Sequence, residues 1–198
     1  MTYTVLHLEK AKGNDSAMSA HIERTIHPKN ADASRSHLNK ELIIYPEGVN
    51  NRTSAIQYRL DNAHLKRKIG TNQVRAIRVL LSGTHETMKE IEKKKQLENW
   101  CNDNLNWIKE TFGEENLVSA VLHMDEKTPH IHCVFVPITE DGRLSVGDWL
   151  GTGKKLEDHQ TKYAEAMKEF GLERGVKSDR KHHTTEEYRK REASKLNE

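Results

Sequence analysis

Three histidines lie within a span of ten residues, at a spacing suited to binding a metal ion. His130 and His132 are two residues apart, and side chains two apart on a β-strand project from the same face. The apolar run that contains them follows a short polar turn, and the arm before that turn ends at His123. A hairpin would bring the three imidazoles together and leave one side of an ion open, as catalytic metal sites require. We therefore predict a metal centre with His123, His130 and His132 as ligands.

The ligand type narrows the choice of ion, while the role of two nearby carboxylates stays open. Imidazole suits zinc, nickel, iron or manganese better than calcium. Asp125 and Glu126 lie in the turn, where each can bind the ion, orient a histidine from behind or simply form the turn. We favour a supporting role for Glu126.

The apolar patterns around these histidines predict the elements that must position them. Strand-like patterns cover residues 3–8, 41–45, 76–82, 117–124 and 130–138. Helical patterns cover residues 16–25, 53–68, 87–112, 156–170 and 185–196. Gly113 is expected to end the longest of these helices. The order of the elements predicts one α+β domain, with a mainly antiparallel five-stranded sheet flanked by helices.

Composition excludes several classes of protein. Apolar residues make up 34% of the 198 residues and charged residues 31%, which suits one core beneath a highly charged surface. The longest apolar runs are strand-sized, so we expect no membrane segment, and the first residues lack the layout of a secretory signal. Two cysteines imply no disulfide framework. A cytoplasmic protein is the expectation.

The histidine pair also carries a resemblance to a known superfamily. His130-Ile131-His132 resembles the signature of the HUH endonucleases, which include relaxases, rolling-circle initiators and some transposases. The chain is most similar to the MobV relaxases, the Mob/Pre proteins of small plasmids and mobilisable elements. Their first motif is matched by His21-Ile22-Glu23-Arg24 and by the block from Asn30 to Leu42, and their third by the segment from His123 to His132. Lys40 stands where the family has a tyrosine.

The resemblance implies an activity and a nucleophile. The implied activity is nicking of one DNA strand at an origin of transfer, with a covalent 5′-phosphoryl enzyme and a free 3′-hydroxyl. In MobV proteins the nucleophile implied is the first-motif histidine, which corresponds to His21. Arg24, three residues further on, is expected on the same helix face, where it can clamp a phosphate or stabilise the leaving oxygen. Glu126 is expected to hold His21 in its reactive tautomer.

The resemblance also implies cofactors, partners and boundaries. The expected cofactor is a divalent ion, Mn²⁺ or Mg²⁺ in use, with zinc or nickel possible in vitro. The expected partners are single-stranded and hairpin-containing origin DNA, a conjugative coupling protein, and a second copy bound through a C-terminal region beyond this chain. Residues 1–175 would form the relaxase domain and 176–198 a basic helical extension. Expected DNA contacts are Arg24, Arg35, Asn39, Arg75, Arg78, Arg174 and Lys177.

Three other interpretations remain open on the sequence. An HUH replication initiator or transposase would use a tyrosine, for which Tyr163 is the well-placed candidate after the metal motif; within a relaxase, Tyr3, Tyr45 and Tyr58 are the alternatives to His21. A zinc hydrolase would use a metal-bound water with Glu126 as general base. A non-catalytic DNA-binding protein would hold a closed, structural metal.

Overall fold

A computed structural model describes residues 2–11 and 15–176 of the chain. The helix expected at 185–196 and the DNA contact expected at Lys177 lie outside the described residues. Within them, α1 (Ser16–Ile22) and α2 (Arg52–Asp61) come early in the chain, and α3 (His85–Lys93) and α4 (Leu97–Phe112) occupy the middle. Two more helices, α5 (Val146–Leu150) and α6 (Gly153–Ala166), follow the last strand. Short 3-10 helices cover Ala33–Leu38 (η1), Glu114–Asn116 (η2) and Lys168–Phe170 (η3).

The five strands form one antiparallel sheet, as the sequence predicted. They are β1 (Thr4–Lys10), β2 (Lys40–Glu41), β3 (Ile77–Gly83), β4 (Leu117–His123) and β5 (His130–Phe135). Their spatial order is β1-β3-β5-β4-β2, and every pair is antiparallel. The hairpin of β4 and β5 therefore lies near the middle of the sheet, and its register pairs His123 with His130.

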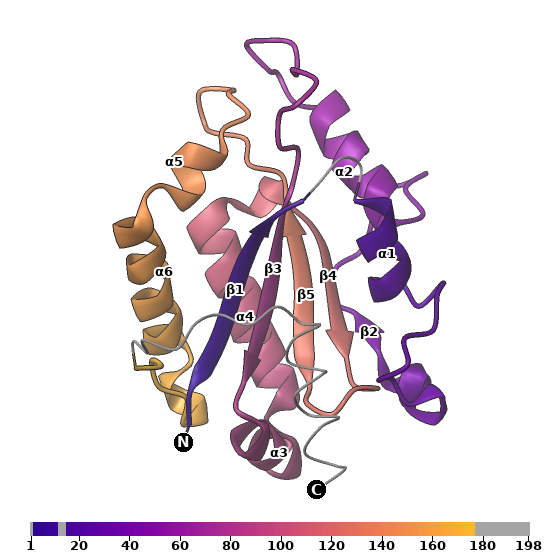
Figure 1. Ribbon diagram of the computed structural model, residues 1–198, viewed down its shortest axis with the longest axis vertical. Coiled ribbons are helices and arrows are strands. Elements are labelled where there is room, and N and C mark those ends of the chain that lie inside the picture. Colours follow the sequence, from indigo (N-terminus) through magenta and orange to yellow (C-terminus); the bar gives the residue numbers. More distant parts are fainter. Residues whose placement is uncertain (1, 12–14, 177–198) are drawn as a thin grey trace, which may run out of the picture.

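One face of the sheet carries the larger core. Alternate residues of β5, namely Ile131, Cys133 and Phe135, point to this face and are fully or almost fully buried. Helix α4 crosses behind the sheet in Figure 1 and adds Trp100 and Phe112 to the same core, while α6 runs along the β1 side. Burial of this face fixes which strand residues point the other way, and those include the histidines.

The opposite face is only partly covered. Helices α1 and α2 lie on the β4–β2 side of the sheet (Figure 1), and α2 helps to bury Val134 and Val136 in a second, smaller core. Over β1 this face is open, since the side chains of His7 and Glu9 are 63% and 51% exposed. The histidine pair of β5 lies between the covered part and the open part.

The helix predicted over 87–112 is two helices. Helix α3 ends at Lys93, and Lys95 adopts a left-handed conformation with φ of 58°. The N–H of Gln96 bonds the carbonyl of Ile91, and the N–H of Lys95 bonds that of Glu92. These two bonds form a Schellman ending, here with lysine where glycine is usual. Since the apolar spacing continues across the break, periodicity alone predicted one helix.

Other boundaries also differ from the prediction. The strand expected at 41–45 pairs only through Glu41, with one further backbone bond from Leu42 to Ala120, and Ile44 is 98% exposed. The helix expected at 53–68 ends at Asp61, since after Asn62 the backbone leaves the helical bonding pattern: Ala63 bonds Leu60, and Lys66 bonds the carbonyl of Gly142 in a neighbouring loop. The predicted end of α4 at Gly113 is confirmed, with φ of 86°. Among the described residues, no helix is long and apolar enough to cross a membrane.

Candidate metal centre and active site

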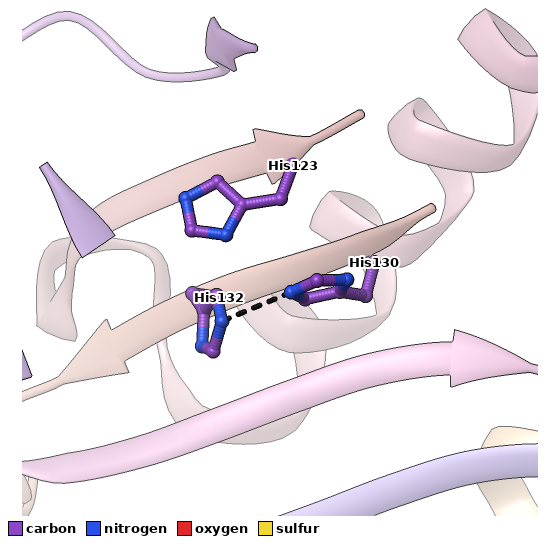
Figure 2. Close-up of side chains that lie close together, drawn as sticks. All are labelled: His123, His130 and His132. Carbon is purple, nitrogen blue, oxygen red and sulfur yellow. Dashed lines mark hydrogen bonds between the residues drawn. The ribbon is translucent and has the colours of Figure 1, made fainter. Parts of the chain in front are cut away.

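The structure brings the three predicted histidines into one cluster. Nitrogen atoms of His123, His130 and His132 all lie within 4.8 Å of one another. The closest pair is Nε2 of His130 and Nε2 of His132, which are 3.2 Å apart (Figure 2). His123 comes from the end of β4, and the other two rings project from the adjacent strand β5. The hairpin geometry inferred from the spacing is therefore present.

The outer nitrogens of two rings are held by backbone carbonyls. Nδ1 of His130 donates to the carbonyl of Thr128 at 2.9 Å, and Nε2 of His123 donates to that of Ile22 at 2.9 Å. Each bond leaves the other ring nitrogen with a lone pair, and that of His123, on Nδ1, lies 3.1 Å from Nη2 of Arg24, which would have to yield it to an ion. Metal-ligating histidines are fixed in this way by a carbonyl or carboxylate on the far side of the ring. The donor set thus fits a divalent ion.

Burial keeps the rings of His123 and His132 neutral. It lowers the pKa of His123 to about 4, with further lowering by His130 and Arg24. Burial likewise lowers the pKa of His132 well below its usual value, and the neighbouring His130 and His123 add to this effect. Neutral imidazoles are the metal-binding form, so no proton has to be displaced from these two rings at neutral pH.

Arg24 does not lie on the helix face where the sequence placed it. Helix α1 ends at Ile22, and Arg24 follows in a left-handed conformation with φ of 56°. Its side chain nevertheless folds back to α1, because Nη1 donates to the carbonyl of His21 at 2.6 Å. Its Nη2 lies 3.1 Å from Nδ1 of His123. The contact with His21 is therefore made through the backbone after the helix, and the i, i+3 argument was wrong.

Asp125 holds Arg24 in this position. Its carboxylate accepts from Nε and Nη2 of Arg24 at 2.8 and 2.7 Å, from Ser36 at 3.0 Å and from Asn39 at 2.8 Å. The Arg24 hydrogen bonds, with those of Asn39 and Ser36, hold the pKa of this carboxyl well below its usual range. With its side chain fully buried and its oxygens committed, Asp125 is a structural anchor for the turn.

Glu126 lies between the predicted nucleophile and the metal cluster. Its Oε1 is 4.0 Å from Nε2 of His21 and 4.0 Å from Nδ1 of His123. The same carboxylate accepts from Arg24 at 2.8 Å and from Asn30 at 2.7 Å. Its distance from His21 is an ion-pair distance, longer than the hydrogen bond that holding one tautomer requires. Asn30 was not predicted as a site residue from the sequence, where it appears only as the start of a matched motif.

His21 stands at the edge of the cluster. Its ring centroid is 6.4 Å from that of His132, and its side chain is 35% exposed. His21 lies in the last turn of α1, which places its ring at this edge. A ring that is partly accessible and close to the metal ligands can reach a phosphate bound between them.

The expected DNA contacts are dispersed rather than gathered in one patch. The side chain of Asn39 is already hydrogen-bonded within the protein, since its Oδ1 accepts from the N–H of Met124 at 2.7 Å and its Nδ2 donates to Asp125. Arg78 pairs with Glu9 at 2.9 Å and Arg75 lines a hollow between α1 and α2, whereas Arg174 is exposed. Arg35, in η1, is half-buried.

The tyrosine alternatives differ sharply in accessibility. Tyr163 is fully buried, donates its hydroxyl to Asn104 at 2.8 Å, and has a pKa raised well above its usual value by burial. It cannot attack DNA from that position. Tyr45 is half-buried with its hydroxyl 3.3 Å from Ser119, and Tyr58 is 43% exposed. Tyr3 lies beside the first strand, in a bridge to Glu173.

Arg52 is a second arginine at the site that the sequence did not reveal. It is fully buried, pairs with Asp15 at the start of α1, and donates Nη1 to Ser19 at 2.8 Å. Its backbone N–H bonds Glu23 just after the helix, at 2.5 Å. Arg52 thus ties both ends of the helix that carries His21. The sequence signal, a lone arginine at the start of a polar helix, resembles an ordinary surface residue.

A sheet of this topology with histidines clustered on its central hairpin is the fold of a relaxase domain. The MobM relaxase domain bound to plasmid pMV158 origin DNA, a Mn-bound crystal structure at pH 6.8, superposes with a TM-score of 0.84. The two share 27% identity over 96% of this chain and 98% of that one. A second Mn-bound structure of MobM with pMV158 origin DNA, at pH 5.5, matches with a TM-score of 0.83 and 29% identity over 96% and 99% of the two chains.

The chain belongs to the Mob_Pre family, plasmid recombination enzyme, whose model matches residues 1–190. A 65 kDa protein of Zymomonas mobilis is 35% identical over 186 residues, which are 91% of this chain and 31% of that protein. Plasmid recombination enzyme type 3 of Staphylococcus aureus is 29% identical over 204 residues, covering 96% and 48%. The chain therefore spans half or less of the length of these curated relatives.

Proposed function

We propose that this chain nicks one strand of DNA at the origin of transfer of a plasmid or mobile element. The reaction is a metal-dependent transesterification that joins the new 5′ phosphate to His21 and frees a 3′-hydroxyl. The observation that carries the proposal is the position of His21, whose ring centroid lies 6.4 Å from that of His132 in the three-histidine cluster. The Mn-bound structures of MobM support a divalent ion as the cofactor.

His123, His130 and His132 would hold the ion. Bound there, a divalent ion polarises the scissile phosphate and neutralises charge on its oxygens. The far sides of the rings of His130 and His123 are fixed by the carbonyls of Thr128 and Ile22, which orients their other nitrogens toward the ion. The carboxylate of Glu126 lies 4.0 Å from His123 and brings negative charge to the same point.

His21 would act as the nucleophile. A lone pair of its ring forms the N–P bond while the bond from phosphorus to the 3′ oxygen breaks, and the 3′ oxygen takes a proton from solvent. The ring gains positive charge as it bonds to phosphorus, and it then loses its N–H proton. The carboxylate of Glu126, 4.0 Å from Nε2, stabilises that charge. Reversal of the same steps rejoins the strand.

Arg24 would act as a positioning residue. Its guanidinium binds Asp125 and Glu126 and donates to the carbonyl of His21, so it fixes the end of α1 relative to the hairpin that carries the ligands. These contacts replace the phosphate clamp expected from the sequence.

DNA would approach over the open face of the sheet. This face extends from β1 across β3 to the histidines of β5, and Arg75 and Arg174 are the candidate phosphate contacts along its margins. Binding through phosphates predicts an affinity that falls steeply as salt is added.

Covalent capture tests the proposal. The 198-residue chain is incubated with Mn²⁺ and a pool of single-stranded oligonucleotides with a randomised core, and protein-linked DNA is recovered after denaturation. We expect adducts on 5′ ends that vanish with chelator and in His130→Ala and His132→Ala, while His64→Ala, an exposed control in the loop after α2, retains them. Cleaved DNA free of protein would instead indicate a hydrolase, and bound but uncut DNA a non-catalytic binder.

A further inference from the structure

A hollow of about 500 Å³ lies beside His21 and is not used by the chemistry described above. Its walls come from α1, β1 and β3, and they include His21, Glu9, Asp15 and Arg78. Glu9 and Arg78 face each other across the two strands in direct register. On β3, Arg78 is two residues from Leu80, which pairs with His132, so the hollow lies on the same sheet face as the histidines.

The charges around the hollow balance. Nη2 of Arg78 is 2.9 Å from Glu9 and its Nη1 is 3.6 Å from Asp15, while Asp15 also pairs with the buried Arg52. Two arginines therefore meet two carboxylates. A phosphate would be attracted weakly to such a neutral set, and it would be repelled by the carboxylate of Glu9 that already faces the guanidinium.

Arg78 nevertheless keeps hydrogen-bonding capacity for a neutral ligand. A guanidinium has five N–H donors in one plane. Only one of its contacts here, to Glu9, is at hydrogen-bond distance, so N–H groups of its two terminal nitrogens remain for a ligand, while its Nε is buried out of reach. The hollow thus offers planar donors from Arg78 next to carboxylate acceptors from Glu9. A flat ligand with acceptors on one edge and donors on another is complementary to this pair.

We propose that this hollow binds the base of a nucleotide flanking the scissile phosphate, and that it selects guanine. Guanine presents two adjacent acceptors, O6 and N7, which suit a guanidinium. It also presents two adjacent donors, N1–H and the N2 amino group, which suit a carboxylate. No other DNA base has both pairs. The proposal rests on the nicking function proposed for His21, because the position of that ring next to the hollow places the base beside the scissile bond.

Sequencing of captured ends identifies the flanking bases. From the randomised pool, the protein-linked fragment reports the base after the cut and the released fragment the base before it. We expect guanine at one of these positions in the wild type, with an advantage of at least about tenfold over other bases. Glu9→Gln and Arg78→Lys should each reduce that advantage about tenfold while adducts still form. Glu90→Gln is the matched control, since that glutamate is 56% exposed on α3, and it should change nothing.

Base analogues assign the two contacts separately. The selected oligonucleotide is bound in chelator, which prevents cutting, and affinity is followed by fluorescence anisotropy. Inosine, which lacks the N2 amino group, should weaken binding to the wild type and not to Glu9→Gln. The 7-deaza analogue of guanine, which lacks N7, should weaken binding to the wild type and not to Arg78→Lys. An abasic nucleotide that binds as well as guanine would show a phosphate contact and overturn the proposal.

The outcomes separate this proposal from the proposed function. Adducts that form without base preference, or with a guanine preference that survives Glu9→Gln, would reject the base site and leave nicking intact. If the pool gives no adduct, the fraction retained by the protein in chelator is sequenced instead. Guanine enrichment in this fraction that is lost in Glu9→Gln would support the base site, although the nicking proposal had failed. Absence of guanine enrichment would reject both the base site and the nicking proposal.

Discussion

At the scale of single residues, the side chain of Asp125 accepts hydrogen bonds from Arg24, Ser36 and Asn39 although none of it is exposed. Through Arg24 it is connected to the backbone of His21 and to the ring of His123. A buried carboxylate in such a set is tolerated because every oxygen is paired. Removing its charge leaves the guanidinium of Arg24 without its main partner.

Asp125→Asn is therefore expected to destabilise the protein by about 3 kcal/mol, since it breaks a buried ion pair by removing one partner. Urea unfolding measures the change, and capture assays should show a parallel loss of adduct. Asp141→Asn is the control, because that carboxylate lies in an exposed turn and its removal should leave the unfolding midpoint nearly unchanged. Equal stability of Asp125→Asn and the wild type would contradict the anchoring role.

The depressed pKa of His123 predicts how stability without metal depends on pH. Burial lowers this pKa to about 4, against 6.5 for an exposed histidine. Between these values the unfolded chain binds a proton that the folded chain excludes, so the free energy of unfolding falls as pH drops from about 6.5 to 4. The loss from this ring is about 2 to 4 kcal/mol. Urea unfolding is measured in chelator at a series of pH values. The free energy of unfolding should fall less steeply with decreasing pH in His123→Asn than in the wild type, and an identical pH dependence would refute the assignment.

At the scale of elements, the hairpin of β4 and β5 was the most predictable part of the molecule. A period of two residues places His130 and His132 on one face whatever the surrounding fold, and the polar turn limits where His123 can lie. The contacts of Arg24 and Arg52 were not predictable, because they depend on a left-handed residue after α1 and on a cross-contact to Asp15. Neither leaves a periodic signal in the sequence.

The break between α3 and α4 gives a test at this scale. Lys95 has a φ of 58° in the Schellman ending, a conformation that costs a residue with a Cβ about 1 kcal/mol relative to glycine. Lys95→Gly should therefore stabilise the protein by about 1 kcal/mol in urea unfolding. Lys94→Gly, at a φ of −78°, should destabilise it by a similar amount. The reverse order of the two variants would indicate that α3 and α4 do not separate at this point.

At the scale of the whole molecule, one face of the sheet is covered by the larger core and the other face is partly open and carries the candidate site. The larger core, built around Trp100, Phe112 and Phe135, fixes the sheet from behind, and α1 and α2 cover only part of the front. The histidines lie between the covered and the uncovered part of the front, and the hollow at Arg78 and His21 opens beside them. With the function proposed above, this division would let a DNA strand reach the site without unfolding an element.

Metal binding should stabilise the entire fold. An ion that binds only the folded chain, supplied at about 100 times its dissociation constant, adds about 2.7 kcal/mol to the free energy of unfolding. Each protein is compared with its own metal-free state. We expect Mn²⁺ to raise the free energy of unfolding by this increment in the wild type and in His7→Ala, and to give no increment in His130→Ala. An unchanged increment in His130→Ala would place the ion elsewhere.

The account depends most on the attachment of DNA to His21. The measurement that tests it is peptide mapping of the captured adduct at neutral pH, followed by a brief acid treatment. We expect the 5′ phosphate on the peptide that contains His21, released by acid because a phosphoramidate is acid-labile, and no adduct in His21→Ala. Attachment to Tyr3, Tyr45 or Tyr58 through an acid-stable bond would contradict the account.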